Sequence, residues 1–287
     1  MTGFEGVHAA AVTPRGPKGD IDFGASFELI DYFSKAGLSG IVLFASEGEY
    51  PAFTAQERSR LVYLAVKRSR VPVLAGVGSA TLDGALALAR EAAGAGAAAL
   101  LVPPPHFFRY DQDDIRAFYE QFAAEAGRDA RLLLYHSPET SSIAPETAAA
   151  LLAGGRFCGV VDAGDGDGSF RCLCGNVLGG DAALLDEAPA SVVSGAACAA
   201  PQLVVALHRA LRCGASAEPL RGGLRALLEH AAGFPRPALW KACLALRGVK
   251  TGYATSPLST RKQREMDEFR QWFPAWLAEY GKMSANA

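Results

Sequence analysis

The stretch VPVLAGVGSATLDGALALAREAAGAGAAALLVP, residues 71–103, contains two short apolar runs joined by a segment rich in alanine and leucine. The runs at 71–77 and 98–103 are continuously apolar rather than alternating, which is typical of strands buried on both faces of a parallel sheet. The joining segment carries Arg90, Glu91 and glycines, so it indicates a helix and a turn rather than a membrane span. The stretch therefore predicts a strand–helix–strand unit.

Apolar runs of this kind recur along the chain, mostly at intervals of about 25 to 35 residues, the length of one strand and one helix. Segments between them have apolar residues at helical spacing, and two begin with a predicted cap. Thr54 with Glu57 forms a capping box, and Asp111 caps a segment that Gly127 closes. Eight runs are predicted as strands: 8–12, 40–45, 71–77, 98–103, 131–136, 157–161, 176–178 and 191–193.

Eight parallel strands, each followed by a helix, describe an α/β fold of the (β/α)8 TIM barrel type. A doubly wound open sheet is the alternative, and the number of strands favours a closed barrel. After the last run, three helices are predicted with no strand between them, at 201–214, 217–233 and 235–248. We therefore expect a barrel over residues 1–213 and a C-terminal helical appendage of the same unit over residues 214–287.

Charge and composition argue against several functional classes. The 287 residues have a formal net charge of -2, with 28 Lys and Arg against 30 Asp and Glu, so we expect no nucleic acid and no membrane as partner. The first ten residues lack the basic and apolar regions of a signal peptide. Cys172 and Cys174 are separated by one residue, which fits neither a zinc ribbon nor a redox motif, so reduced thiols in a cytoplasmic protein are expected.

The strand predicted at 157–161 continues into Asp162 and a segment of alternating glycine and aspartate. Its glycines do not have the spacing of a dinucleotide-binding loop, and no Walker A lysine is present. The segment does not match a calcium-binding loop either, because Ala163 and Cys174 would occupy ligand positions. Too few residues separate Asp162 from the next strand for a full sixth helix, so we predict a clipped or irregular segment there.

In a TIM barrel the C-terminal ends of the strands meet at one face, where catalytic residues collect. Each candidate there also has a structural explanation, such as a cap or a packed aromatic ring. Together, however, two histidines and several carboxylates favour a functional site. The residues at or just past the predicted strand ends are Ser46, Glu47, Glu49, His106, Phe107, Tyr135, His136, Val161 and Asp162.

The order of these residues resembles the dihydrodipicolinate synthase and N-acetylneuraminate lyase family, over nearly the whole chain. Its members are aldolase-like barrels that form a Schiff base between a lysine and pyruvate or another 2-oxo acid. Residues 40–58 match the family's G-T-T-G-E-S-x-x-L-S-x-x-E-R segment in position and retain Gly48, Glu49, Glu57 and Arg58. The resemblance implies a TIM barrel, a small-molecule ligand, no cofactor, and a homo-oligomer of two or four subunits.

The chain departs from the family pattern at the position that carries the family's Schiff-base chemistry. The family's sixth strand ends in G-[IV]-K-[DE], where the lysine is the Schiff-base nucleophile, and here the same positions read Gly159-Val160-Val161-Asp162. Because valine has no nucleophile, no imine is expected at residue 161.

Other ligand positions of the family pattern have changed as well. Ser46 and Glu47 replace the two threonines, and Glu47 puts a negative charge where the carboxylate of a 2-oxo acid would lie. Phe107 takes the place of a phenol that reaches into a neighbouring subunit, and Thr140 that of an arginine in the synthase branch. The phenol of the proton relay, Tyr135, is retained.

Two interpretations follow. In the first, the protein is a carbon–carbon or carbon–oxygen lyase without a Schiff base that acts on a small oxo- or hydroxy-acid. Tyr135, Glu47 and His136 are then the predicted catalytic residues. In the second, it is a catalytically silent barrel that binds a small ligand or a partner. The predicted substrate-binding residues are Ser46, Phe107, Thr140, Val161 and Asp162.

A divalent metal would suit the first interpretation, because carboxylate and imidazole ligands at Glu47, His106, His136 and Asp162 suit Mg, Mn or Zn. No metal site is predicted. Asp162 in particular should point away from the barrel interior if Val161 points into it, since side chains alternate along a strand.

Four other lysines are candidates to replace the missing nucleophile. Lys241 and Lys250 belong to the C-terminal helices and are expected at the solvent or at an oligomer surface. Lys35 and Lys67 are expected on outer barrel helices. None is predicted to form the imine.

Overall fold

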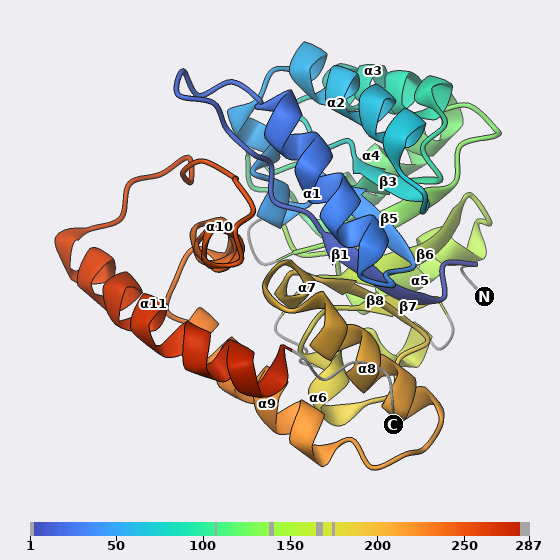
Figure 1. The fold of residues 1–287 in the computed structure, drawn as a ribbon. Helices are drawn as coiled ribbons and strands as arrows, with labels where there is room; N and C mark the ends of the chain where they lie inside the picture. Colours follow the sequence, from blue (N-terminus) through green and yellow to red (C-terminus); the bar gives the residue numbers. More distant parts are fainter. Residues whose placement is uncertain (1–2, 107, 138–140, 165–168, 174–175, 282–287) are drawn as a thin grey trace.

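The chain folds into a closed barrel of eight parallel strands surrounded by helices (Figure 1). The computed structural model describes residues 3–106, 108–137, 141–164, 169–173 and 176–281. Neighbouring strands follow the order of the chain, and β8 closes the barrel by pairing with β1. The predicted (β/α)8 fold is confirmed.

Each predicted run coincides with a strand, within a few residues at each end. The first strand begins two residues earlier than predicted, because its pairing with β8 starts at Gly6, opposite Ser191. The strands are β1 Gly6–Ala10, β2 Gly40–Leu43, β3 Val73–Gly76, β4 Ala99–Val102, β5 Leu132–His136, β6 Phe157–Asp162, β7 Val177–Gly179 and β8 Ser191–Ser194.

One α-helix follows each of the first five strands before the next strand begins, and the pattern changes after β6. The described residues between β6 and β7 form only a short 3-10 helix, η3 Arg171–Leu173, as the glycine-rich sequence predicts. The barrel helices are α1 Phe23–Lys35, α2 Ala55–Arg68, α3 Leu82–Ala95, α4 Gln112–Glu125, α5 Pro145–Ala153, α6 Ala183–Asp186, α7 Ala196–Ala199 and α8 Pro201–Arg212.

Three helices complete the chain: α9 Glu218–Ala231, α10 Arg236–Leu246 and α11 Thr260–Tyr280. Figure 1 shows them on one side of the barrel. There α10 packs against α7 and against the turn that follows β2, and α11 packs against α9 and α10. The division at residue 213 stays a prediction.

The strands divide their side chains between two apolar clusters. One cluster joins the strands to the surrounding helices and includes Leu134 and Val160. The other consists mostly of strand residues and fills the barrel interior, with Leu133, Tyr135 and Val161 among its members. Because adjacent residues point to opposite faces, Val161 points inward.

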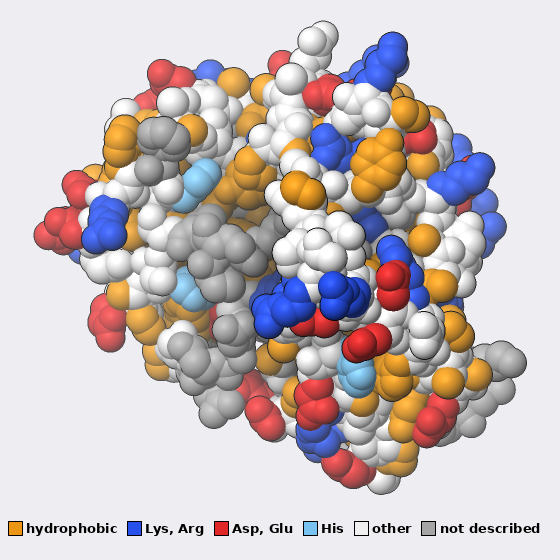
Figure 2. Space-filling model, turned by 90° about the vertical axis from the view of Figure 1, so that its left-hand side faces the viewer, with side chains coloured by type: hydrophobic (Ala, Val, Ile, Leu, Met, Phe, Trp, Pro, Cys, Tyr) orange, Lys and Arg blue, Asp and Glu red, His pale blue; other side chains and the backbone are white. Residues whose placement is uncertain are grey.

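The surface on the side of α10 carries acidic and basic side chains close together, without an extended patch of one charge (Figure 2). Among the described residues, no helix is long and apolar enough to cross a membrane.

The capping box predicted at the start of α2 is present. The Thr54 hydroxyl accepts a hydrogen bond from the backbone of Glu57, and the Glu57 carboxylate accepts one from the backbone of Thr54 at 2.9 Å. Replacing Thr54 by alanine should therefore lower the free energy of unfolding by about 1 kcal/mol. Urea unfolding measures the loss, and Thr54→Ser, which keeps the hydroxyl, should lose much less.

The capping box also makes the stability difference between wild type and Thr54→Ala depend on pH. The hydrogen bond from the Thr54 hydroxyl is the largest cause that lowers the pKa of Glu57 below its usual 4.5. A carboxyl group with a lowered folded-state pKa stabilises the protein above its unfolded pKa, and this contribution is lost as the pH falls through the folded value. The gap between wild type and Thr54→Ala should thus shrink below about pH 4.5; an unchanged gap would contradict this account.

Candidate functional site

The turn after β2 places Ser46 and Glu47 at the C-terminal mouth of the barrel. Ser46–Gly48 form a 3-10 turn, η1, and the residues Phe44 and Glu49 near its ends have φ angles of 59° and 50°. Such left-handed conformations are unfavourable for residues other than glycine and persist only where the surroundings hold them. One such contact is the Thr13 hydroxyl, which donates to the carbonyl of Gly48 at 2.8 Å.

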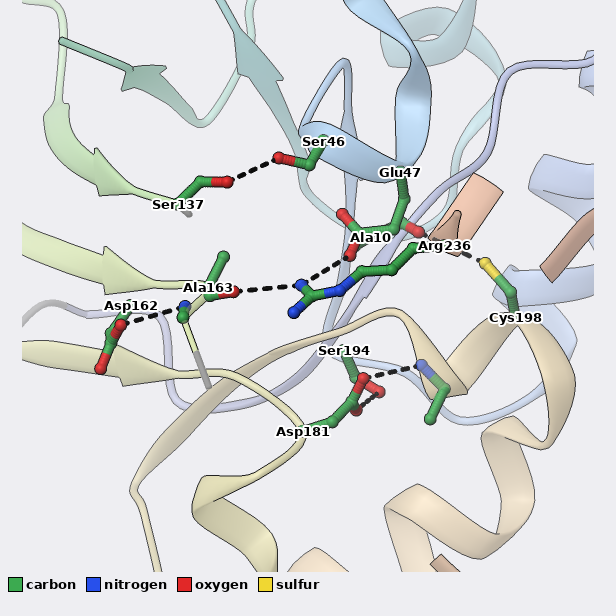
Figure 3. A network of polar contacts seen from close by, with 12 residues as sticks. Ala10, Ser46, Glu47, Ser137, Asp162, Ala163, Asp181, Ser194, Cys198 and Arg236 are labelled. Atoms are coloured by element: carbon green, nitrogen blue, oxygen red, sulfur yellow. Dashed lines mark hydrogen bonds and ion pairs between the residues drawn. The ribbon is translucent and has the colours of Figure 1, made fainter. Parts of the chain in front are cut away.

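Three hydroxyl groups meet beside this turn. The phenol of Tyr135 donates to Oγ of Ser46 at 3.0 Å and accepts a hydrogen bond from the Ser46 backbone at 3.1 Å. The hydroxyls of Ser46 and Ser137 are 3.0 Å apart (Figure 3). Strands β2 and β5 are therefore linked at the mouth by groups that can both donate and accept a proton.

Glu47 points from the same turn toward Arg236, at the start of α10 (Figure 3). The Glu47 side chain is 6% exposed, and its Oε1 lies 3.8 Å from Nη1 of Arg236. The same Nη1 donates to the carbonyl of Ala163, just after β6, at 3.1 Å. Arg236 thus connects the C-terminal helices to two loops of the barrel mouth and places a positive charge beside a buried carboxylate.

A second buried carboxylate, Asp181, follows β7. It accepts hydrogen bonds from the Ser194 hydroxyl and from the backbone of Ala196 at 2.9 Å. Burial raises the pKa of Asp181, against the lowering effect of these hydrogen bonds. Because its partners lie on either side of Gly195, Asp181 fixes the backbone of the turn between β8 and α7.

These groups line a cavity of about 380 Å³ between the barrel mouth and helices α9 and α10. A cavity of this size can hold a small organic molecule. Its polar wall includes Glu47, Asp181 and Arg236, and its remaining wall includes Gly195 and Trp240.

The predicted catalytic residues do not all reach this cavity. Glu47 lines it, and Tyr135 contacts the neighbouring Ser46. His136 lies on the outer side of β5, where its Nδ1 accepts a hydrogen bond from the backbone of Ile143 at 3.4 Å and its ring packs against Phe170. The alternation along β5 separates His136 from Tyr135.

The predicted substrate-binding residues are also dispersed. Asp162 accepts a hydrogen bond from the backbone of Gly164 at 3.1 Å, and Val161 is buried in the barrel interior. Phe107 and Thr140 lie outside the described residues, and His106 packs edge-on against Tyr50. Among the residues that the structure describes, no group of three or more His, Cys, Asp or Glu side chains could hold a metal ion.

The expectation that Lys241 lies at the solvent or at an oligomer surface is wrong. Its side chain is 3% exposed and forms an ion pair with Glu49, and Nζ also donates to the carbonyl of Tyr253 at 3.1 Å. Burial lowers the pKa of Lys241, opposed by the charge of Glu49. The sequence identified the helix, but not that this face of α10 packs against the turn after β2. Lys35, Lys67 and Lys250 are exposed.

Asp181, Gly195, Arg236 and Trp240 are among the cavity residues that the sequence did not predict. A signal existed for Asp181, because it follows the strand predicted at 176–178 almost directly, as the other candidates follow theirs. Arg236 and Trp240 belong to a helix without a preceding strand, so the strand-end rule could not find them.

Removing the cation of the Lys241–Glu49 pair should be strongly destabilising. We expect Lys241→Met to lower the free energy of unfolding by about 3 to 5 kcal/mol, because it leaves a buried, unpaired carboxylate. Adding Glu49→Gln in the same chain should restore part of this loss. Denaturant unfolding measures both variants.

Lys250→Met, at an exposed position, is the matched control and should change stability by less than about 0.5 kcal/mol. A loss in Lys241→Met no larger than that of the control would show that the pair contributes nothing.

Comparison with known proteins places these observations in context. The Dihydrodipicolinate synthetase family matches this chain over residues 3–275. The 4-hydroxy-tetrahydrodipicolinate synthase of Chelativorans sp. is 33% identical over 275 residues, which cover 90% of this chain and 93% of that protein. The synthase of Salinibacter ruber is 40% identical over 149 residues, which are 50% of this chain and 49% of that protein, so this match spans about half of the relative's length.

Among solved structures, the 4-hydroxy-tetrahydrodipicolinate synthase from Methylacidiphilum fumariolicum SolV has the same fold. Its TM-score is 0.85 at 25% sequence identity, and the superposition covers 96% of this chain and 98% of that one.

Proposed function

Since the chain belongs to the dihydrodipicolinate synthetase family, we propose that it binds and acts on a small oxo- or hydroxy-acid at the mouth of the barrel without forming a Schiff base. The observation that carries this proposal is Val161. Its side chain is fully buried in the barrel interior and stands directly opposite Tyr135 in the pairing of β5 with β6. An alkyl group at this place offers no nucleophile to a carbonyl carbon.

The position of the buried Lys241 gives further support. Lys241 is paired with Glu49 and lines a different depression, on the side of α10 that faces residues 252–258. A lysine that is held by a carboxylate and does not line the cavity with Glu47 and Arg236 is poorly placed to attack a ligand there.

The groups at the mouth are suited to binding and proton transfer. The linked hydroxyls of Tyr135 and Ser46 can pass a proton, and the guanidinium of Arg236 supplies a positive charge for an acid beside Glu47. Chemistry of this kind corresponds to a lyase that uses acid–base catalysis alone. By analogy with the family, we also propose that the protein is cytoplasmic and assembles as a homo-oligomer of two or four subunits.

Borohydride trapping tests the absence of the imine. Wild-type protein treated with pyruvate and borohydride should keep its intact mass, since no lysine reaches the bound ligand. A family member that carries the lysine, treated in parallel, should gain the mass of the reduced adduct. A stable adduct on this protein, mapped by peptide mass spectrometry to Lys241 or to any other lysine, would refute the proposal.

A further inference from the structure

The cavity at the barrel mouth has an apolar side as well as a polar one. A group of apolar side chains from the C-terminal part of the chain lines it, together with the carboxylates and Arg236. Three of them lie on α9 or at its end, at positions i, i+3 and i+4, which share one face of a helix. The group, called the apolar wall below, consists of Leu228, Ala231, Ala232 and Phe234.

The apolar wall is held by the helices behind it. The backbone N–H of Phe234 donates to the carbonyl of Ala231 at 3.0 Å, so the turn after α9 keeps these two residues together. The ring of Phe234 packs against Phe269 of α11, with the ring centroids 6.3 Å apart, and Nζ of Lys262 lies 5.2 Å from its centroid. The wall is therefore part of the packing of α9 against α11.

The side chains of this wall are not fully covered by the protein. Leu224 and Leu227, on the inner face of the same helix, are completely buried. Leu228 and Phe234 are only partly buried, and Ala232 is exposed. Removing apolar surface from water is favourable, so an alkyl or aryl group that covers this wall would bind more tightly than one that leaves it wet.

The charges in the cavity limit the ligand to one carboxylate. Among the described residues that line the cavity, Arg236 is the only cation, whereas Glu47 and Asp181 are both carboxylates. One carboxylate of a ligand can lie beside Arg236. A second carboxylate would find no further cation and would be repelled by Glu47 and Asp181. Hydroxyl groups of a sugar acid placed against the apolar wall would give up hydrogen bonds to water without replacement.

We propose that the ligand is a monocarboxylic acid with an apolar side chain, whose carboxylate lies beside Arg236 while its alkyl or aryl group covers Leu228 and Phe234. This inference rests on the proposed function and narrows its oxo- or hydroxy-acid to one without a second carboxylate or a chain of hydroxyls. The cavity volume of about 380 Å³ leaves room for a side chain longer than the methyl group of pyruvate.

A homologous series of acids tests the inference. Titration calorimetry measures the dissociation constants of the unbranched 2-oxo acids from pyruvate to 2-oxohexanoate, and of the corresponding 2-hydroxy acids. In at least one of the two series the affinity should rise about fourfold for each added CH₂ group, because each one is buried against the apolar wall. By contrast, 2-oxoglutarate, whose chain ends in a second carboxylate, should bind about tenfold or more weakly than 2-oxohexanoate.

Two variants of one residue assign the preference to the apolar wall. Leu228→Asn replaces an apolar side chain by a polar one of similar size, and should weaken binding of the six-carbon acid about tenfold or more and that of pyruvate much less. Leu228→Lys adds a second cation and should make 2-oxoglutarate bind more tightly than 2-oxohexanoate. Leu246→Asn is the matched control, because Leu246 is exposed near the end of α10 and is not among the described residues that line the cavity. It should bind both acids as wild type does.

The outcomes separate this inference from the proposed function. If wild-type protein binds these acids but its affinity stays level or falls as the chain grows, the apolar subsite is overturned and the proposed function is not. The same holds if 2-oxoglutarate binds as tightly as 2-oxohexanoate, or if Leu228→Asn keeps the full gain per CH₂ group. If no acid of any length binds to wild-type protein, the proposed function fails and the inference fails with it.

Discussion

The buried ion pair between Glu49 and Lys241 joins the turn after β2 to the C-terminal helix α10, and the arrangement of the barrel mouth depends on it. Glu49 also accepts hydrogen bonds from the backbone and hydroxyl of Thr255, so one carboxylate holds two C-terminal segments. The pair holds Glu49 in a left-handed conformation, next to the turn that carries Ser46 and Glu47. It also anchors the helix that brings Arg236 and Trp240 over the mouth.

The residues that match the family pattern and those that depart from it have different roles. Glu49 forms the ion pair, Glu57 closes the capping box of α2, and Arg58 donates to the carbonyls of Gly76 and Gly78. These retained side chains support the fold. The departures at Ser46, Glu47 and Val161 lie in the mouth or just below it and leave the barrel intact.

A valine at residue 161 and the presence of Glu47 are physically consistent. A carboxylate close to a Schiff-base lysine would pair with it, whereas here Glu47 lies beside Arg236, with Val161 in the apolar interior. Arg236 comes from the C-terminal helices rather than from a strand end, so these helices supply a charged wall of the cavity.

The sequence by itself determined the barrel. Continuous apolar runs such as 71–77 and 98–103 can be buried only in a parallel sheet covered on both faces, and their spacing leaves room for one helix each. It also determined that residue 161 is an apolar group at a strand end and that the described residues between β6 and β7 form only a short 3-10 helix. These features depend on local composition and periodicity, which the chain carries in every segment.

Only the tertiary structure decided which side chains meet. Glu47 and Arg236 are 189 positions apart, and nothing local indicates that α10 crosses the mouth or that Lys241 is buried beneath it. His136 follows Tyr135 directly yet points to the other side of β5, because alternation along a strand separates neighbours in sequence. A site of this kind is formed by long-range packing of α10 against the barrel, so its donors and acceptors become neighbours only when the whole chain has folded.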